Sequence, residues 1–492
     1  MEQRRLLRDG LFNMSASVLT ALLGLIAVPL FVSRLPTGAY ADWIVTLATA
    51  RTSIIIDFGI GWTVVHLVAL EGGRLSDETQ AQLRTAATLL GGLSVVIAPV
   101  VFAAGALELG DLRGARLAIV GAGAIMATAS HINSYTMAVL AGSRRYDLSS
   151  LIVTLEAASS SGGVITILLS GGGIMAVATW EAIVVVSACI VKLIVAARLC
   201  PTAAFRPALR WPTAPGRVIR FSIESQVSDG LADLFWNLGV LIVGQIGPAA
   251  VVTFHVAQKV PVALIGFISR AAEVTMPAAS GALAAQVDAR ATVAISSSRI
   301  AMALSLPAVI TLWFAAAPFL LVWVGQDDPD LTAMLQIAGV AVAAHAMGEG
   351  ARYFLWGMEL IGAIVIVQVV GTAGLILCAA ALWWTDRLDA LSVSLLQAGS
   401  VAIMSLAFGV LAAARTGMTT VTYARRIGRG MPMALVAAFA AASALIAVWS
   451  TPSWPFLLAI AAATAVAFYG AMFVFGLDPA EAVAVRSLLR RA

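Results

Sequence analysis

Apolar runs of about 20 residues or more follow one another along almost the whole chain, and only short polar or Gly/Pro-containing breaks separate them. A hydrophobic stretch of 18 or more residues is long enough to cross the roughly 30 Å hydrocarbon core of a bilayer as a helix. Only 11% of the 492 residues are charged, less than half of the roughly 25% found in soluble globular domains. The sequence therefore predicts an all-α, polytopic membrane protein.

The runs predict about 14 transmembrane helices. The predicted spans are residues 11–33, 40–70, 82–106, 116–141, 148–170, 172–198, 218–246, 249–275, 293–324, 330–357, 360–384, 389–414, 432–450 and 454–476. The first run is too long for a secretory signal and leads directly into a second apolar segment, so we expect it to be retained as a helix. About 35 residues remain for each helix with its loop, which leaves no room for a soluble catalytic domain, and we expect the protein not to be an enzyme.

The arginines are distributed unevenly between the two sides of the predicted membrane. With a cytoplasmic N-terminus, 21 arginines fall on the cytoplasmic side, and four fall in outer loops: Arg34, Arg113, Arg116 and Arg387. Cytoplasmic loops carry an excess of Lys and Arg, so both termini are predicted to be cytoplasmic. The net charge of +4 then comes from the arginines that set the topology and that attract anionic membrane lipids. No nucleic-acid partner is expected.

A segment rich in proline and arginine, residues 200–217, interrupts the series of spans. Residues 32–38 and 243–249 show a weak internal sequence similarity, and each segment follows one long helix and leads into another span. This agrees with two six-helix lobes in the same orientation, a parallel repeat of the kind that transporters use. The predicted parts are an N-lobe (1–199), a basic cytoplasmic linker (200–217), a C-lobe (218–414), a basic cytoplasmic loop (415–431), and two extra C-terminal helices with a tail (432–492).

The seventh predicted span carries a polar stripe. Its residues lie at i, i+3, i+7 and i+11, on one face of a helix: Gln226, Asp229, Asp233 and Asn237, with Glu224 to one side. Polar and ionisable residues inside a membrane usually face a cavity or a partner. The stripe indicates either the wall of a water-filled cavity or an amphipathic helix on the cytoplasmic surface.

Other ionisable residues lie within the first ten spans. Arg51 and Asp57 are six residues apart and on different faces of the second span, so we expect Arg51 to be a cation facing a cavity. Two pairs at i, i+3 can face a cavity or simply neutralise each other: Arg270 with Glu273, and Glu349 with Arg352. Lys259 is open to both interpretations. Lys192 is near the end of its span, and we expect it to snorkel to the membrane surface.

Several kinds of site are absent from the sequence. The only lysines are Lys192 and Lys259, so no phosphate-binding loop of the G-x-x-x-x-G-K-[ST] type exists, and H-E-x-x-H is also missing. The three cysteines, at positions 189, 200 and 378, are too scattered for a zinc site or a disulfide framework. We expect no metal and no cofactor.

The region that follows the first span resembles a known family. It reads VPLFVSRLPTGAYADW (residues 28–43), and the second span contains IIIDFGIG (residues 54–61). With the basic N-terminal stub and Asn13, these motifs resemble the polysaccharide transporter, or lipid-linked oligosaccharide flippase, branch of the multidrug/oligosaccharidyl-lipid/polysaccharide (MOP) exporter superfamily. Twelve spans are usual in that branch, whereas fourteen are typical of the peptidoglycan-precursor (lipid II-type) flippase branch.

The resemblance implies two six-helix lobes around a central cavity that opens alternately to each side of a bacterial inner membrane. It implies outward movement of a polyprenyl-pyrophosphate-linked glycan, with a glycan polymerase and export machinery as candidate partners. Cavity cations would receive the pyrophosphate, and helix position makes four available: Arg51, Lys259, Arg270 and Arg352. The candidate coupling or cavity polar residues are Asp57, Glu224, Asp229, Asp233, Asn237, Glu273 and Glu349. The alternatives are a lipid II-type flippase and a cation-coupled multidrug exporter of the same superfamily.

Overall fold

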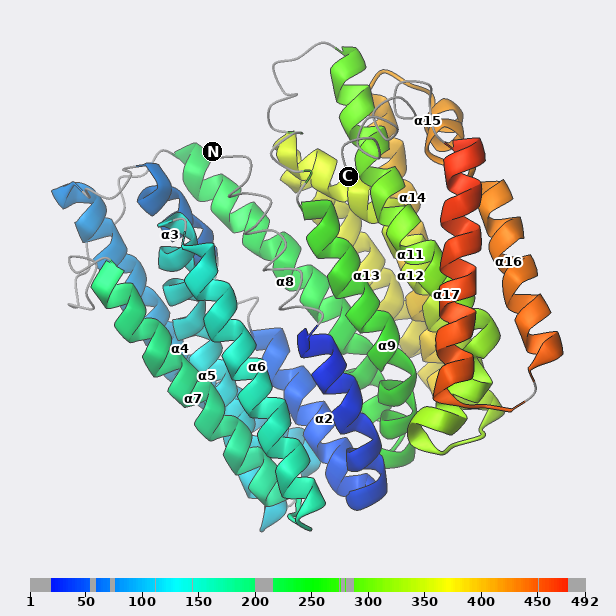
Figure 1. The fold of residues 1–492 in the computed structure, drawn as a ribbon. Helices are drawn as coiled ribbons and strands as arrows, with labels where there is room; N and C mark the ends of the chain where they lie inside the picture. Colours follow the sequence, from blue (N-terminus) through cyan, green and yellow to red (C-terminus); the bar gives the residue numbers. More distant parts are fainter. Residues whose placement is uncertain are drawn as a thin grey trace. The chain divides into compact units, whose positions relative to one another are not determined.

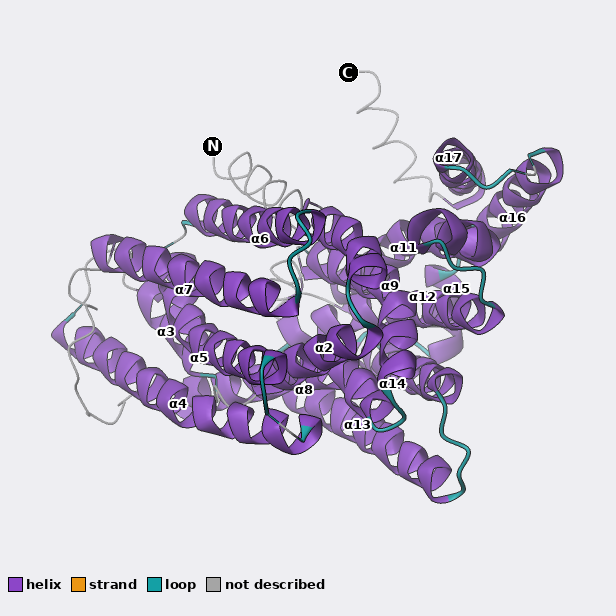
Figure 2. Cartoon of the chain, turned by 90° about the horizontal axis from the view of Figure 1, so that it is seen from below, coloured by secondary structure: helices purple, strands orange, loops and turns teal. Residues whose placement is uncertain are grey.

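The structure is a computed structural model, and it describes residues 19–53, 59–70, 76–110, 112–143, 145–199, 216–273, 275, 279, 287–449 and 451–476. Within these ranges every regular element is a helix and no strand occurs (Figure 2). Twelve helices in the described part of the chain are long and apolar enough to cross a membrane. The predicted all-α fold is confirmed, and the chain is a multi-pass membrane protein.

The twelve membrane-length helices correspond one to one to the last twelve predicted spans. They are α4 (Asp77–Leu109), α5 (Ala115–Gly142), α6 (Tyr146–Leu169), α7 (Ile174–Leu199), α8 (Gly216–Gly244), α9 (Pro248–Glu273), α11 (Val287–Val324), α12 (Pro329–Gly357), α13 (Ile361–Trp384), α14 (Ala390–Arg415), α16 (Met431–Val448) and α17 (Trp454–Ala471). A π-helical turn, Met472–Gly476, extends α17. The first predicted span, residues 11–33, overlaps a shorter apolar helix, Leu19–Arg34.

The second predicted span, residues 40–70, differs from the expectation of one continuous helix. It contains two helices, α2 (Thr37–Thr52) and α3 (Ile60–Leu70). Gly59, directly before α3, has a φ of +77°, a left-handed conformation that a continuous α-helix excludes and that glycine adopts readily. The span is therefore broken at Gly59, while residues 54–58, with the candidate Asp57, lie outside the described residues.

A short helix, α15 (Thr420–Ile427), lies in the predicted cytoplasmic loop 415–431 and was not expected from the sequence. The Thr419 side chain caps its start by accepting a hydrogen bond from the Thr422 N–H at 3.2 Å. Tyr423 and Ile427 are buried, and most other side chains of the helix are exposed. The helix has only eight residues, and two of them are arginines. A hydropathy search for membrane spans therefore does not detect it.

The contacts divide the chain into two compact units. The first contains the described residues up to His255, with Ile361–Thr372 and Leu388–Ala390, and the second contains the other described residues. In the first unit α5 packs against α4 and α7, and α8 packs against α2 and α3 (Figure 1). In the second unit α11 packs against α12 and α17, and α16 against α17. The predicted lobe boundary falls in the linker 200–217, most of which lies outside the described residues, and it stays a prediction.

Small residues allow several helices to approach closely, as is usual where helices associate inside a membrane. In the first unit, a Cβ added at Gly123 of α5 would overlap the Thr46 side chain of α2, and one at Gly142 would come within 2.6 Å of Val68 on α3. In the second unit, Gly350 of α12 lies against the backbone of α11 at Ser298. These contacts fix helix pairs at short distances.

Large apolar side chains are exposed along many of the membrane-length helices. Examples on α4 are Val95 (74% exposed) and Val96 (59% exposed), and on α13 Leu377 (69% exposed). Such surface would be unfavourable in water and is suited to lipid hydrocarbon. In the second unit, Trp323 at the end of α11 stacks on Phe319, and the ring of Trp454 at the start of α17 lies edge-on to Phe319. Aromatic residues of this kind mark a membrane–water interface.

Candidate functional site

Arg51 lies in the last turn of α2, near the break in the second span. It is about 21 Å along the helix axis from Thr37 at 1.5 Å per residue. Its neighbour Ala50 packs in one cluster with Ile97 and Ala127, which lie near the middles of α4 and α5. Arg51 is thus at the depth of the hydrocarbon core, where a charge costs about 2.5–3.5 kcal/mol on insertion scales.

Two carboxylates from other helices interact electrostatically with Arg51: Glu181 of α7 and Asp233 of α8. Neither forms a contact ion pair with it, and in the described part of the chain no ion pair uses the Arg51 guanidinium. The Ser160 hydroxyl of α6 donates a 2.7 Å hydrogen bond to Glu181. These four residues, named here the Arg51 cluster, join α2, α6, α7 and α8.

The polar stripe of α8 is partly buried and partly exposed. Gln226 is buried, Asp229 and Asn237 are half-buried, and Asp233 is exposed. The Asn237 amide donates a 2.8 Å hydrogen bond to the backbone carbonyl of Asp233. Arg220–Gly244 is itself long and apolar enough to cross a membrane, which favours the cavity-wall interpretation over a helix lying on the surface.

Close packing fixes the broken span against α8. A Cβ at Gly59 would overlap the backbone carbonyl of Ser222 on α8, so only glycine fits this contact. Two residues further along α8, Glu224 accepts a 2.7 Å hydrogen bond from Arg220 as an ion pair at i, i+4. Discontinuous helices form the ligand sites of many transporters, and Arg51 lies in the last turn of α2, the first of the two helices of this span. The end of α2 at Arg51 is therefore the best candidate for a ligand site in the first unit.

A buried ion pair links α6 and α7 in the same unit. Lys192 Nζ lies 2.6 Å from Glu156 Oε2, and the Lys192 side chain is only 4% exposed. The expectation that Lys192 snorkels to the membrane surface is wrong, because Glu156, 36 residues away, neutralises it inside the bundle. Glu156 and Glu181 lie within the predicted spans 148–170 and 172–198, but their partners are remote in sequence and no spacing pattern could reveal them.

The second unit contains a buried polar network on α9 and α12. Arg352 donates two hydrogen bonds to the Glu349 carboxylate, at 2.9 and 2.8 Å, in a bidentate arrangement. Ser269 of α9 donates a 2.6 Å hydrogen bond to Glu349, and His345 lies 3.5 Å from the same carboxylate. The Arg352 guanidinium also lies 4.5 Å from the centre of the Tyr353 ring. The network holds Arg352 firmly and neutralises its charge.

The other predicted cations of the second unit are placed differently. Arg270 and Glu273 form a 3.3 Å ion pair at the end of α9, and their side chains are 53% and 44% exposed. Lys259 is half-buried in the middle of α9. The preceding residue, Gln258, donates a 3.3 Å hydrogen bond to Gln397 of α14. Among the described residues no group of three or more His, Cys, Asp or Glu could hold a metal ion.

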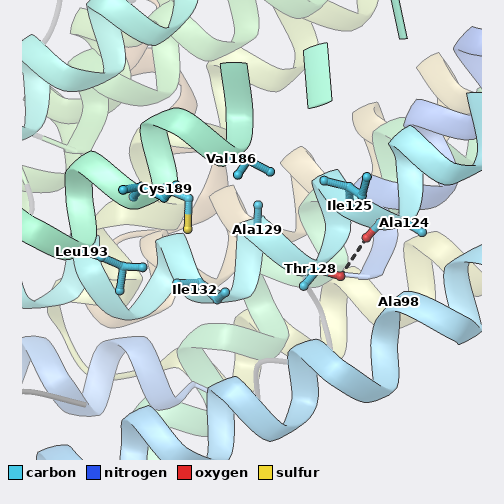
Figure 3. A pocket seen from close by; sticks show the side chains of 10 residues that line it. Ala98, Ala124, Ile125, Thr128, Ala129, Ile132, Val186, Cys189 and Leu193 are labelled. Carbon is cyan, nitrogen blue, oxygen red and sulfur yellow. Dashed lines mark hydrogen bonds between the residues drawn. The ribbon is translucent and has the colours of Figure 1, made fainter. Parts of the chain in front are cut away.

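An apolar pocket of about 310 Å³ lies between α4, α5 and α7 of the first unit (Figure 3). Ala98, Ile125, Ala129, Cys189 and Leu193 are among its lining residues. The hydroxyl of Thr128, the polar side chain of the lining, donates a 2.8 Å hydrogen bond to its own helix at the Ala124 carbonyl. A charged group would lose its hydration here without compensation, so this pocket does not suit an ionic ligand.

No protein-family model matches the sequence, and no curated protein matches it. Solved structures do share its fold. The lipid II flippase MurJ, in an inward closed conformation, has a TM-score of 0.70 at 9% identity, with 94% of this chain and 98% of that chain covered. An inward-facing multidrug resistance MATE transporter has a TM-score of 0.65 at 16% identity, with 83% and 98% covered.

A third similar structure is a MOP superfamily transporter from Pyrococcus furiosus, with a TM-score of 0.62 at 16% identity and coverage of 84% of this chain and 95% of that chain. At these identities the likeness shows the fold alone. The chain thus has the fold of MOP superfamily transporters, in agreement with the superfamily that the sequence motifs resemble.

Proposed function

We propose that the protein is a membrane transporter that moves a polyprenyl-pyrophosphate-linked oligosaccharide across a bacterial inner membrane by alternating access. The observation that carries the proposal is the placement of Arg51, an exposed cation at mid-membrane depth beside a broken helix. A guanidinium binds phosphate oxygens through two parallel hydrogen bonds. No bond is made or broken in this process, so the protein acts as a carrier and not as an enzyme.

The carboxylates of the Arg51 cluster have a role in the empty state. Glu181 and Asp233 balance the charge of Arg51 electrostatically, which lowers the cost of keeping an arginine inside the membrane. One cation and two anions give the ionised cluster a net charge of −1, which opposes a pyrophosphate. Uptake of a proton or another cation by these carboxylates would therefore accompany substrate binding, and this step couples transport to an ion.

The membrane potential favours export of such a substrate. A negative head group that leaves a negative interior gains about 2.3 kcal/mol per charge per 100 mV. For a pyrophosphate with a charge near −2, the gain is roughly 4–5 kcal/mol at 100 mV. A glycan polymerase and export machinery would then take the glycan at the outer face.

Among the predicted cavity cations, we give Arg51 the main role. Arg352 and Arg270 are each paired with a glutamate on their own helix, and we propose that these two pairs are structural. Within the polar stripe, Asp229, Asp233 and Asn237 are proposed to line the path of the sugar residues, whose hydroxyl groups are hydrogen-bond partners for carboxylates and amides.

Two alternatives have specific support. The excess of carboxylates over Arg51 in its cluster favours export of organic cations, and MATE transporters share the fold. The similarity to MurJ extends over 94% of the chain and supports a lipid II-type precursor as the cargo. Drug susceptibility in an exporter-deficient cell tests the first alternative, and the chemical identity of the accumulated lipid tests the second.

The proposal is tested by deleting the gene and analysing the lipids of the host. We expect a lipid-linked glycan to accumulate on the cytoplasmic face, and the wild-type gene to reverse this. The Arg51→Gln variant, produced at equal level, should fail to reverse it, whereas Arg113→Gln, a change of the same kind in an outer loop, should succeed. Normal surface glycan in the deletion strain, with no accumulated lipid, would refute the proposal.

A further inference from the structure

The short helix α15 and the last residue of α14 carry a group of exposed arginines in the second unit. Arg415, Arg425 and Arg426 are all exposed, and we call them the α15 patch. None of the ion pairs in the described part of the chain involves them. The segment 415–430 contains a fourth arginine, Arg429, and no aspartate or glutamate. The patch therefore presents positive charge that no acidic neighbour in the segment balances.

One face of α15 is fixed to α11, which leaves the patch on the other side. Tyr423, 2% exposed, forms hydrogen bonds to the Ser298 hydroxyl at 3.1 Å and to the Ala294 carbonyl at 3.3 Å. Ile427, one turn later, is 5% exposed. Val421 on the free face is 60% exposed. The helix is thus docked through two side chains and presents its arginines and an apolar residue outward.

The level at which α15 docks can be measured along α11. Ser298 is about 39 Å from Val324 at the other end of this helix, at 1.5 Å per residue. That other end carries the stacked pair Phe319 and Trp323, next to Trp454, as expected for an interfacial aromatic belt. The hydrocarbon core is about 30 Å thick, and about 40–45 Å with the head groups. The α15 patch therefore lies level with the opposite head-group layer.

The ends of neighbouring helices meet α11 at this same level. Arg299, next to Ser298, donates a 2.6 Å hydrogen bond from Nη2 to the carbonyl of Gly476, where the π-helical turn after α17 ends. A Cβ at Gly430, just before α16, would overlap Gly476. Figure 1 shows α15 at the end of α16 and α17 at which α16 begins. Several helices therefore end at one level, as they do at a membrane surface.

We propose that the α15 patch binds the head groups of anionic phospholipids. Clusters of Lys and Arg beside a membrane-spanning helix or on an amphipathic helix attract anionic lipids by about 1 kcal/mol per residue, which corresponds to about fivefold in association constant. Guanidinium groups suit phosphate because they bind its oxygens in pairs. The site is separate from the Arg51 cluster, which lies in the other unit, and it stands whether or not the proposed cargo is correct.

The test measures lipid preference next to α15 in the full-length protein. Val421→Cys, in a background with the three native cysteines changed to Ser, carries an environment-sensitive fluorophore. The protein is reconstituted into phosphatidylcholine vesicles with increasing brominated phosphatidylglycerol, and quenching gives the relative association constant of the two lipids. We expect a preference for phosphatidylglycerol that falls about fivefold for each arginine changed to Gln in Arg415→Gln, Arg425→Gln and Arg426→Gln.

The control removes the same charge elsewhere. Arg34→Gln, Arg113→Gln and Arg387→Gln together change three arginines of the predicted outer loops, and the preference at Val421 should stay at the wild-type value. About 0.5 M salt should weaken the preference in the wild type, because ions screen head-group attraction. Equal association of the two lipids in the wild type, or an equal decrease in both triple variants, overturns the proposal. The first result would indicate that the patch is available for an acidic protein partner instead.

Discussion

At the scale of single residues, the buried contact pairs of the described spans differ from Arg51. Glu156 with Lys192, and Glu349 with Arg352, are contact pairs with side chains 21% exposed or less. Arg51 differs, because its carboxylate partners act without contact. Paired charges are suited to holding helices together, whereas a charged side chain that forms no contact ion pair can bind a ligand. This difference is the reason for assigning substrate binding to Arg51.

The Glu349–Arg352 pair should contribute less to the stability of the protein than the loss caused by changing one partner alone would suggest. Glu349→Gln leaves a buried guanidinium without its counter-ion, and we expect a loss of about 3–5 kcal/mol. The double variant Glu349→Gln/Arg352→Gln removes both charges and should be less destabilised than Glu349→Gln. The measurement is thermal unfolding of the purified protein in detergent.

The exposed pair Arg270 and Glu273 provides the matched control at the same i, i+3 spacing. Arg270→Gln and Glu273→Gln should each change stability by no more than about 0.5–1 kcal/mol, because exposed ion pairs contribute little. A Glu349→Gln protein as stable as these controls would show that the α12 network does not hold the second unit together.

Gly59 should be intolerant of any side chain. Gly59→Ala adds a Cβ at a φ of +77° and against the carbonyl of Ser222, so conformational strain and overpacking together should cost about 2–4 kcal/mol. Gly91→Ala in α4, where nothing lies within 4 Å of the added Cβ, should be neutral or stabilising by up to about 1 kcal/mol. The measurement is the melting temperature of each variant in detergent, which should be lower than that of the wild type for Gly59→Ala and equal or higher for Gly91→Ala. A Gly59→Ala protein as stable as Gly91→Ala would contradict the described contact between Gly59 and α8.

At the scale of helices, hydropathy predicted the elements well wherever a span is one continuous helix. The last twelve spans agree with helices of the structure to within about six residues at each end, because length and apolar composition are what a bilayer requires. The break at Gly59 was not predicted, since IIIDFGIG is as apolar as a continuous helix and the break depends on a contact with α8, more than 150 residues later.

The candidate site was predictable only in part. The polar stripe of α8 follows from spacing within one helix, and Arg51 was selected because a charge at mid-span is costly. Glu181 and Ser160 of the Arg51 cluster come from other helices and share no sequence pattern with Arg51. The helix α15 was missed for a different reason, because its two buried residues, Tyr423 and Ile427, give too short a pattern to recognise.

The docking of α15 through Tyr423 should depend on pH only in alkaline solution. Burial raises the pKa of Tyr423 from 10.0 to about 12, although the hydrogen bond with Ser298 acts in the opposite direction. Since the folded-state pKa lies above the unfolded value, this stabilisation is fully present below about pH 10 and is lost as the pH rises toward 12. Tyr423→Phe should lose about 1 kcal/mol at neutral pH.

The measurement is the difference in melting temperature between wild type and Tyr423→Phe from pH 7 to 11. The difference should be constant up to about pH 10 and then decrease, since only the wild type can lose the proton. A difference that already changes between pH 7 and 9 would mean that some other group controls the docking of α15.

At the scale of the whole molecule, the arginine distribution predicts the topology. Arg425 of α15 should lie in the cytoplasm, and Arg387 between α13 and α14 should lie outside. In a background without native cysteines, a membrane-impermeant maleimide should label Arg387→Cys in intact cells and Arg425→Cys only after the membrane is permeabilised. Labelling in the reverse order would contradict the predicted topology.

The contacts divide the described residues into two compact units, and the proposed alternating access needs more than one body that can move. In the proposed function, Arg51 receives the pyrophosphate of a lipid-linked oligosaccharide, so the protein recognises the head group and not the lipid tail.

The role of Arg51 is tested by the transbilayer movement of a fluorescent polyprenyl-pyrophosphate oligosaccharide in liposomes that contain the purified protein. An impermeant quencher detects this movement, because it reaches only the lipid in the outer leaflet. We expect the wild type to move the lipid well above the protein-free rate. Arg51→Gln should be slower by about tenfold or more, the effect of losing one charge-assisted interaction, while Arg113→Gln keeps the wild-type rate. Movement by the wild type no faster than in protein-free liposomes would contradict the proposed transport, and an Arg51→Gln protein as fast as the wild type would contradict the role of Arg51.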